Sequence, residues 1–167
     1  MHMKFKGIIF FVAMVALCSC QKSPVQEFCG SYSFKTGGFL ELSAKYYQAD
    51  TVIQRSISSE SGQMRVVADS GNNILMTMNV TGGSLIVMNG TVDGNNVTFG
   101  PVERKILVFK ESGLDLVEDV KVKVSATGRR LGNSIILDFD YEGNFTLGAY
   151  PCTIISSNVK CAANRNE

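Results

Sequence analysis

Three acidic residues, Asp138, Asp140 and Glu142, form the group in this chain that comes closest to a metal-binding motif. With Gly143 they match the first half of an EF-hand loop, in which alternate oxygen atoms surround Ca²⁺ and a glycine permits a sharp turn. The bidentate glutamate that such a loop needs at its twelfth position is replaced by Ala149. We therefore expect these acids on the charged outer face of a strand, with a weak Ca²⁺ site as the alternative. We predict no metal and no other cofactor.

Residues suited to catalysis are scarce. The chain holds one histidine, His2, which lies in a segment that we expect to be removed, so no imidazole is left for a triad, a general base or a metal site. Carboxylates two residues apart on an exposed strand lack the facing cleft that glycoside hydrolysis requires. A cysteine nucleophile needs a neighbouring base. We predict that the protein is not an enzyme.

The N-terminal segment predicts export from the cytoplasm. Lys4 and Lys6 precede an unbroken apolar run, residues 7–17. This run is too short to span a bilayer, but it suits the hydrophobic region of a secretory signal peptide.

The residues that end this run, Leu17-Cys18-Ser19-Cys20, resemble the lipobox of bacterial lipoproteins, in which a cysteine is lipidated and becomes the new N-terminus. Cys20 is the better attachment site, because lipidation of Cys18 would place the bulky Leu17 beside the cleaved bond. Ordinary cleavage near Ser19 and an uncleaved anchor are the alternatives. The expected division of the chain is a removed signal peptide, a lipidated cysteine with a polar tether, and a single domain: residues 1–19, 20–27 and 28–167.

Charge and the residue after Cys20 bear on the location of the protein. Once Lys4 and Lys6 are removed, the 16 basic residues become 14 against 15 acidic ones, a net charge of −1, which favours neither nucleic acid nor anionic lipid as a partner. By analogy with lipoproteins of Gram-negative bacteria, Gln21 rather than Asp favours the outer membrane. A tether without an acidic run favours its periplasmic side, with exposure at the cell surface as the alternative.

From Gly30 onward, apolar and polar residues alternate at period two between turns rich in Gly and Asn, which is typical of an antiparallel all-β domain. Eight to ten such strands suit an up-and-down barrel of roughly eight strands, which leaves no free sheet edge. A β-sandwich is the alternative. Four basic residues are expected on the solvated surface: Arg104, Lys105, Arg129 and Arg130.

Two hairpins have registers that the apolar pattern predicts, because a slip by one residue would turn a strand inside out. In the first, Met64 faces Met78. In the second, Gly90 faces Phe99, and the ring covers the glycine.

A third hairpin is predicted around a four-residue loop, residues 129–132. Pairing of Val124 with Leu137 gathers the apolar side chains of both strands on one face. The same register puts Lys123 opposite Asp138, an attractive cross-strand pair.

Cys29, Cys152 and Cys161 remain outside the lipobox, and an exported domain lies in a compartment that permits disulfides. If Ser156 and Ser157 turn a final hairpin, Cys152 and Cys161 face each other across two strands, close enough to bond. We therefore predict a Cys152–Cys161 disulfide. A bond from Cys29 to either partner and the absence of any bond are the alternatives.

Four methionines suggest an apolar interior: Met64, Met76 and Met78 share one strand face, and Met88 lies on a neighbouring strand. Methionine is flexible and polarizable, so such a surface suits apolar ligands of several shapes. An eight-stranded barrel either holds one small ligand or is filled by side chains. Ordinary core packing is therefore the alternative. The candidate ligand-binding residues are Tyr32, Phe34, Met64, Met76, Met78, Met88, Phe139 and Tyr141.

The lipobox, the sequence Gly30-Ser31-Tyr32-Ser33-Phe34 and turn-punctuated strands such as residues 92–99 make the chain similar to the calycin-like, lipocalin-like barrel lipoproteins of Gram-negative anaerobes. Lipocalins proper begin with Gly-x-Trp, and Gly30-x-Tyr32 stands in that place here. The resemblance implies a membrane-anchored barrel that binds an apolar or lipid-like small molecule without catalysis. The alternative is a structural lipoprotein with a filled barrel, which binds another envelope protein through its outer surface.

Overall fold

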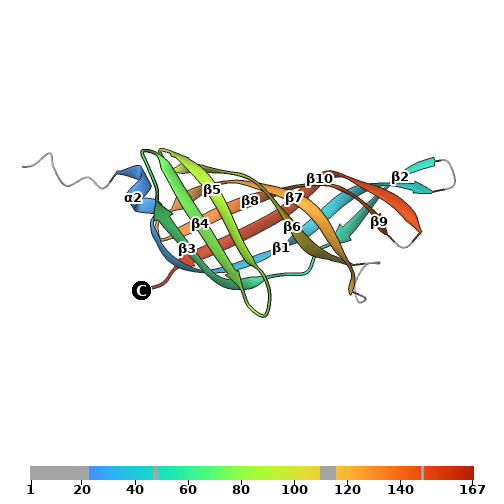
Figure 1. The fold of residues 1–167 in the computed structure, drawn as a ribbon, viewed down its shortest axis with the longest axis horizontal. Helices are drawn as coiled ribbons and strands as arrows, with labels where there is room; N and C mark the ends of the chain where they lie inside the picture. The colour runs from blue at the N-terminus through green and yellow to red at the C-terminus, as the bar shows by residue number, and fades with distance from the viewer. Residues whose placement is uncertain (1–22, 47–48, 110–115, 148) are drawn as a thin grey trace, which may run out of the picture.

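Ten antiparallel strands and one short helix make up the part of the chain that the computed structural model describes, residues 23–46, 49–109, 116–147 and 149–167 (Figure 1). The predicted all-β class is confirmed. The elements, in chain order, are α2 (Pro24–Phe28), β1 (Gly30–Tyr46), β2 (Ala49–Ser56), β3 (Ser61–Ala68), β4 (Asn73–Val80), β5 (Leu85–Asp93), β6 (Asn96–Phe109), β7 (Leu116–Leu131), β8 (Ser134–Glu142), β9 (Asn144–Leu147) and β10 (Tyr150–Arg165).

Eight of the strands close a hydrogen-bonded ring. The strand order is β2-β1-β3-β4-β5-β6-β7-β8-β10-β9, and β1 also pairs with β10, so the ring consists of β1, β3 to β8, and β10. Most neighbours in the ring are consecutive along the chain, which is the meander expected from the regular turns. The predicted eight-stranded architecture is confirmed, although the ring is not an even barrel.

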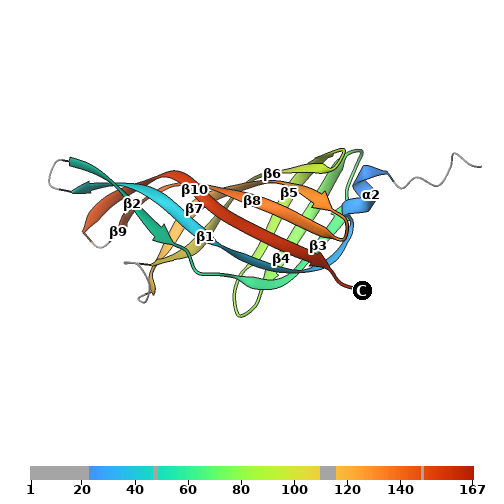
Figure 2. The ribbon, with the colours of Figure 1, turned by 180° about the vertical axis from the view of Figure 1, so that it is seen from behind.

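Two long strands of the ring, β1 and β10, extend beyond it. β1 pairs with β3 through residues 30–35 and with β2 through residues 39–46. In the same way, β10 pairs with β8 near its end and with β9 near its beginning. Figures 1 and 2 show the consequence: β2 and β9 lie at the end of the molecule opposite to α2.

The registers of the first two predicted hairpins are confirmed. Met64 lies opposite Met78 between β3 and β4, and Gly90 lies opposite Phe99 between β5 and β6. A Cβ atom built on Gly90 would lie 2.5 Å from Cδ1 of Phe99, so the ring covers the glycine as expected.

The predicted register of the third hairpin is wrong by four residues. Val124 lies opposite Tyr141 rather than Leu137. Both strands continue to a tight turn in which Gly132 has a φ of 60°, a conformation that glycine adopts without strain. Because the shift is an even number of residues, the same side chains still face the interior.

The predicted disulfide between Cys152 and Cys161 is also wrong. Both cysteines lie on the single uninterrupted strand β10. A strand rises about 3.3 Å per residue, so they lie ~30 Å apart, far beyond the ~7 Å limit for Cα atoms in a disulfide. Ser156 and Ser157 form no turn, because β1 pairs with β10 on both sides of them. The structure holds Cys29, Cys152 and Cys161 as thiols.

Helix α2 begins inside the predicted tether. Pro24 occupies its first turn, and the side chain of the N-cap Ser23 accepts a hydrogen bond from a backbone N–H at 3.4 Å. Val25 and Phe28 are 5% and 0% exposed, so the helix packs into the folded body. Within the described residues no helix is both long and apolar enough to cross a membrane.

Candidate functional site

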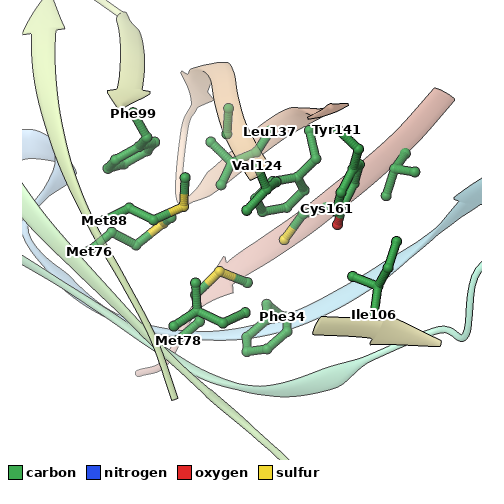
Figure 3. Packing of buried hydrophobic residues seen from close by; sticks show 14 of the residues in the cluster. Phe34, Met76, Met78, Met88, Phe99, Ile106, Val124, Leu137, Tyr141 and Cys161 are labelled. Atoms are coloured by element: carbon green, nitrogen blue, oxygen red, sulfur yellow. The ribbon is translucent and has the colours of Figure 1, made fainter. Parts of the chain in front are cut away.

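The residues predicted to bind a ligand lie in the interior of the molecule. All eight belong to one buried apolar cluster: Tyr32, Phe34, Met64, Met76, Met78, Met88, Phe139 and Tyr141. Figure 3 shows Met76, Met78 and Met88 between the rings of Phe34 and Phe99. The alternation of the strands therefore locates the interior correctly.

Side chains fill this interior. Met76 and Met78 are 0% exposed, and Met64 and Met88 are 1% exposed. A side chain without accessible surface borders no space that would admit a water molecule, and a ligand needs far more room than one water. A molecule bound between the methionines would first have to displace them.

Helix α2 and the end of β10 close one end of the interior. The Tyr32 hydroxyl donates to the carbonyl oxygen of Phe28 at 2.7 Å and accepts from the Arg165 guanidinium at 2.7 Å. That guanidinium lies 5.3 Å from the centre of the Tyr32 ring, within cation–π range. Arg130, which was expected on the solvated surface, is 23% exposed and pairs with Glu27 of α2. Tyr32 is thus held in the wall of the ring by contacts within the chain.

A buried ion pair lies where β6 passes the segment between β2 and β3. The Arg104 side chain is 8% exposed, and its guanidinium binds the Glu60 carboxylate, which is 22% exposed. The prediction that Arg104 lies on the solvated surface is therefore wrong. The alternation of β6 carried the missed signal, because it places Arg104 on the same face as the buried Ile106 and Val108. Lys105 is exposed, as expected.

Hydrogen bonds from β1 and β6 fix the segment that carries Glu60. The N–H of Glu60 donates to the hydroxyl of the buried Thr36 at 3.0 Å, and the N–H of Thr36 donates to the Glu60 carbonyl oxygen at 2.7 Å. On the other side, the N–H of Ser58 donates to the carbonyl oxygen of Leu107 at 3.0 Å. The segment thereby joins β1 to β6.

Two titratable side chains from β8 and β10 lie near this ion pair. Burial raises the pKa of Tyr141 to about 12, partly offset by the positive charge of Arg104 and reinforced by the negative charge of Glu60. Burial also raises the pKa of Cys161 to about 12, and Glu60 again reinforces the shift. At neutral pH the Cys161 thiol is therefore protonated, a state in which it is a poor nucleophile.

The acids of the EF-hand-like motif lie on the outer face of β8, as predicted. Asp138 binds Lys160 at 3.3 Å rather than the predicted Lys123, and both partners are exposed. Asp140 accepts a hydrogen bond from the Ser157 hydroxyl at 2.9 Å. No cluster of three or more potential metal ligands forms among the residues that the structure describes.

No protein-family model matches this chain, and no curated protein matches its sequence. Cys20, the predicted lipid attachment site, lies outside the described residues. The N-terminal sequence and the geometry of the barrel are therefore the features that bear on function.

Proposed function

We propose that this protein is an exported lipoprotein, anchored to the outer membrane through Cys20 and facing the periplasm, whose filled barrel is a rigid support for contacts with a protein partner in the envelope. One observation supports the filled barrel: the side chains of Met76 and Met78 have no accessible surface. A filled interior leaves the outer surface and the loops as the place where binding occurs. The raised pKa of Cys161 favours a non-catalytic role.

Helix α2 sets the orientation that this proposal implies. Only three residues separate Cys20 from Pro24, the first residue of α2, so the tether reaches about 14 Å when fully extended. The end of the barrel that carries α2 then lies beside the membrane. β2 and β9, at the opposite end, point away from it (Figure 1).

A second candidate function is the binding of an apolar small molecule. It is favoured by the methionines Met64, Met76, Met78 and Met88, which meet in one cluster. Methionine repacks readily, so a ligand of suitable shape could displace these side chains.

Anchoring is tested with paired cysteine substitutions. We expect the wild-type chain and Cys18→Ala to fractionate with membranes and to incorporate radiolabelled palmitate, and Cys20→Ala to lose both properties. Two acyl signals are needed for stable attachment, so loss of the attachment site should release the protein completely. Label retained by Cys20→Ala, or lost by Cys18→Ala, would remove the lipoprotein proposal.

The filled barrel is tested by native mass spectrometry with organic extraction of Cys20→Ala protein purified from the periplasm. We expect the mass of the chain alone. A stoichiometric adduct that disappears on denaturation would instead establish the second candidate function and name its ligand class.

A further inference from the structure

Three hairpin turns and helix α2 share one end of the ring (Figure 1). The turns have the same Gly-Asn pair and differ in the residue before it, which is Ser70 between β3 and β4, Asp93 between β5 and β6, and Leu131 between β7 and β8. Of these three residues only Leu131 is apolar, and it is 50% exposed. Polar residues are the usual choice at hairpin turns, so packing within the chain does not account for this leucine.

The leucine turn, residues 131–133, is fixed beside α2. The Arg130 guanidinium binds the Glu27 carboxylate on α2 and donates to the carbonyl oxygen of Gly132 at 2.9 Å. On the other side, the N–H of Arg165 donates to the last carbonyl oxygen of the turn at 2.9 Å. The position of the leucine turn relative to the helix that follows the tether is therefore set by contacts within the chain.

Arg129 supplies a positive charge next to the leucine turn. Its side chain is exposed, and within the described part of the chain it has no ion-pair partner, unlike the neighbouring Arg130. A guanidinium in this state is available to a phosphate oxygen. Asp69 and Asp93 lie at the other two turns of this end. They offset the charge of Arg129, so any attraction to phosphate is local rather than a field of the whole end.

The length of the tether brings this end of the molecule to the bilayer. Three residues lie between Cys20 and Pro24, so lipid chains on Cys20 keep the start of α2 within about 14 Å of the membrane surface. The two exposed residues of α2, Pro24 and Gln26, carry no charge that would resist this approach. The membrane is therefore the surface that the leucine turn meets first.

We propose that the leucine turn is a second membrane contact, in which Leu131 enters the boundary between headgroups and acyl chains and Arg129 binds a lipid phosphate. An apolar side chain beside a cation matches the order of layers at this boundary. The inference rests on the proposed function for the lipid anchor, and it deepens that function by naming the surface of the barrel that faces the bilayer. One leucine and one arginine bind weakly, so the contact depends on the effective concentration that the anchor provides.

The second contact fixes the orientation of the barrel. A tether alone leaves the barrel free to tumble at the membrane surface. Attachment at both α2 and the leucine turn holds this end of the ring against the bilayer. The extension that carries β2 and β9, at the opposite end, then points into the periplasm (Figure 2).

Fluorescence quenching in vesicles tests the contact. The lipidated protein carries the same environment-sensitive fluorophore on Leu131→Cys or, as the control, on Val52→Cys, which lies at the opposite end and is 63% exposed in the wild type. In vesicles of phosphatidylethanolamine and phosphatidylcholine with a quencher on the acyl chains, we expect about fivefold stronger quenching at position 131. Wild-type protein labelled in parallel gives the background from the native thiols. Equal quenching at the two positions overturns the proposal.

The native leucine is tested with the fluorophore on Ser70→Cys, at a neighbouring turn of the same end. Leu131→Ser should lower the quenching at position 70 about threefold, because the barrel loses its apolar contact and moves away from the acyl chains. Leu85→Ser is the matched control, since Leu85 is 64% exposed and lies at the other end of β5. Equal quenching in the two serine variants contradicts a role for Leu131.

Charge reversal tests the phosphate contact. Arg129→Glu should lower the quenching at position 131 about threefold, whereas Arg129→Lys keeps the charge and should retain most of the quenching. Lys45→Glu changes the net charge by the same amount at the opposite end of the molecule, where Lys45 pairs with Asp50 in the register of β1 and β2. An equal loss in Arg129→Glu and Lys45→Glu contradicts a local contact. Quenching that appears only after phosphatidylglycerol is added would mean a diffuse attraction, and it overturns the proposal as well.

The palmitate label on Cys20 separates the two possible failures. Labelled protein without quenching at position 131 overturns the second contact and leaves the anchor in place. Protein without the label overturns the proposed function, and this inference with it.

Discussion

At the scale of single residues, the Phe99 ring packs so closely over Gly90 that it leaves no room for a side chain at position 90. Alanine at position 90 would place its Cβ 2.5 Å from Cδ1 and 2.7 Å from Cε1 of the Phe99 ring. The ring lies in a filled interior and has nowhere to move without displacing other side chains, so we expect Gly90→Ala to lower the free energy of unfolding by about 1–3 kcal/mol. Urea unfolding measures this loss.

Gly100→Ala is the matched control for this prediction. A Cβ atom at Gly100 would have the Asn89 carbonyl oxygen at 3.7 Å as its nearest neighbour, an ordinary contact distance. We expect its urea midpoint to stay close to that of the wild type. Equal effects of the two alanines would show that the Phe99 ring does not pack over Gly90 as described.

Also at the residue scale, the buried Tyr141 and Cys161 predict a loss of stability in alkali. In the unfolded chain a tyrosine ionises near pH 10, but Tyr141 in the folded protein has a pKa of about 12. Between these pH values the folded state binds more protons, so the free energy of unfolding falls by about 1.4 kcal/mol per pH unit for each such group. Cys161 acts in the same direction from about pH 9.

Tyr141→Phe removes the ionisable hydroxyl group and so isolates its contribution to the loss of stability in alkali. Urea unfolding at about pH 9 and about pH 11 should show a smaller loss of stability in Tyr141→Phe than in the wild type. Cys161→Ala should also show a smaller loss of stability than the wild type, and the difference should begin at a lower pH than for Tyr141→Phe. Equal losses in wild type and both variants would mean that these groups ionise in the folded state at ordinary pH values.

At the scale of elements, the sequence predicts hairpins well where the turn and the apolar pattern allow a single register. Met64 opposite Met78 is such a case, and so is Gly90 opposite Phe99. The β7–β8 register was missed because a shift by four residues keeps every side chain on its own face, so the apolar pattern cannot distinguish the two pairings. Only the tight turn at Gly132 decides between them.

Two further features, the continuity of β10 and the ion pair of Arg104, involve contacts between distant parts of the chain. Ser156 and Ser157 have the composition of a turn, yet β10 continues through them with a shift of register, because it pairs with β1 on both sides. Glu41 on β1 and Asp140 on β8 also accept hydrogen bonds from the two serine hydroxyls, at 2.7 and 2.9 Å. This long-range pairing separated the two cysteines expected to bond. Arg104 differs, because the alternation of β6 indicated its burial, and only the identity of its distant partner Glu60 lay beyond the local pattern.

At the scale of the whole molecule, the two ends of the ring of strands differ. The end with α2 is closed by buried side chains and by the contact of Arg165 with Tyr32. The other end is an extension in which β1 and β10 carry β2 and β9 outside the ring (Figure 1). The barrel predicted from the sequence was expected to abolish sheet edges, but the extension restores them at β2 and β9.

A substitution that creates a cavity tests whether the interior of the barrel is filled in solution. Met76→Ala removes a fully buried side chain, and we expect it to cost about 2–5 kcal/mol and to leave an apolar cavity. Such cavities stay dry and bind small apolar molecules, so benzene should raise the melting temperature of Met76→Ala through mass action but leave that of the wild type unchanged. Met76→Leu, which keeps the volume, should behave like the wild type. If benzene stabilises the wild-type protein as much as it stabilises Met76→Ala, the barrel already holds an accessible cavity, and apolar ligand binding becomes the better account of its function.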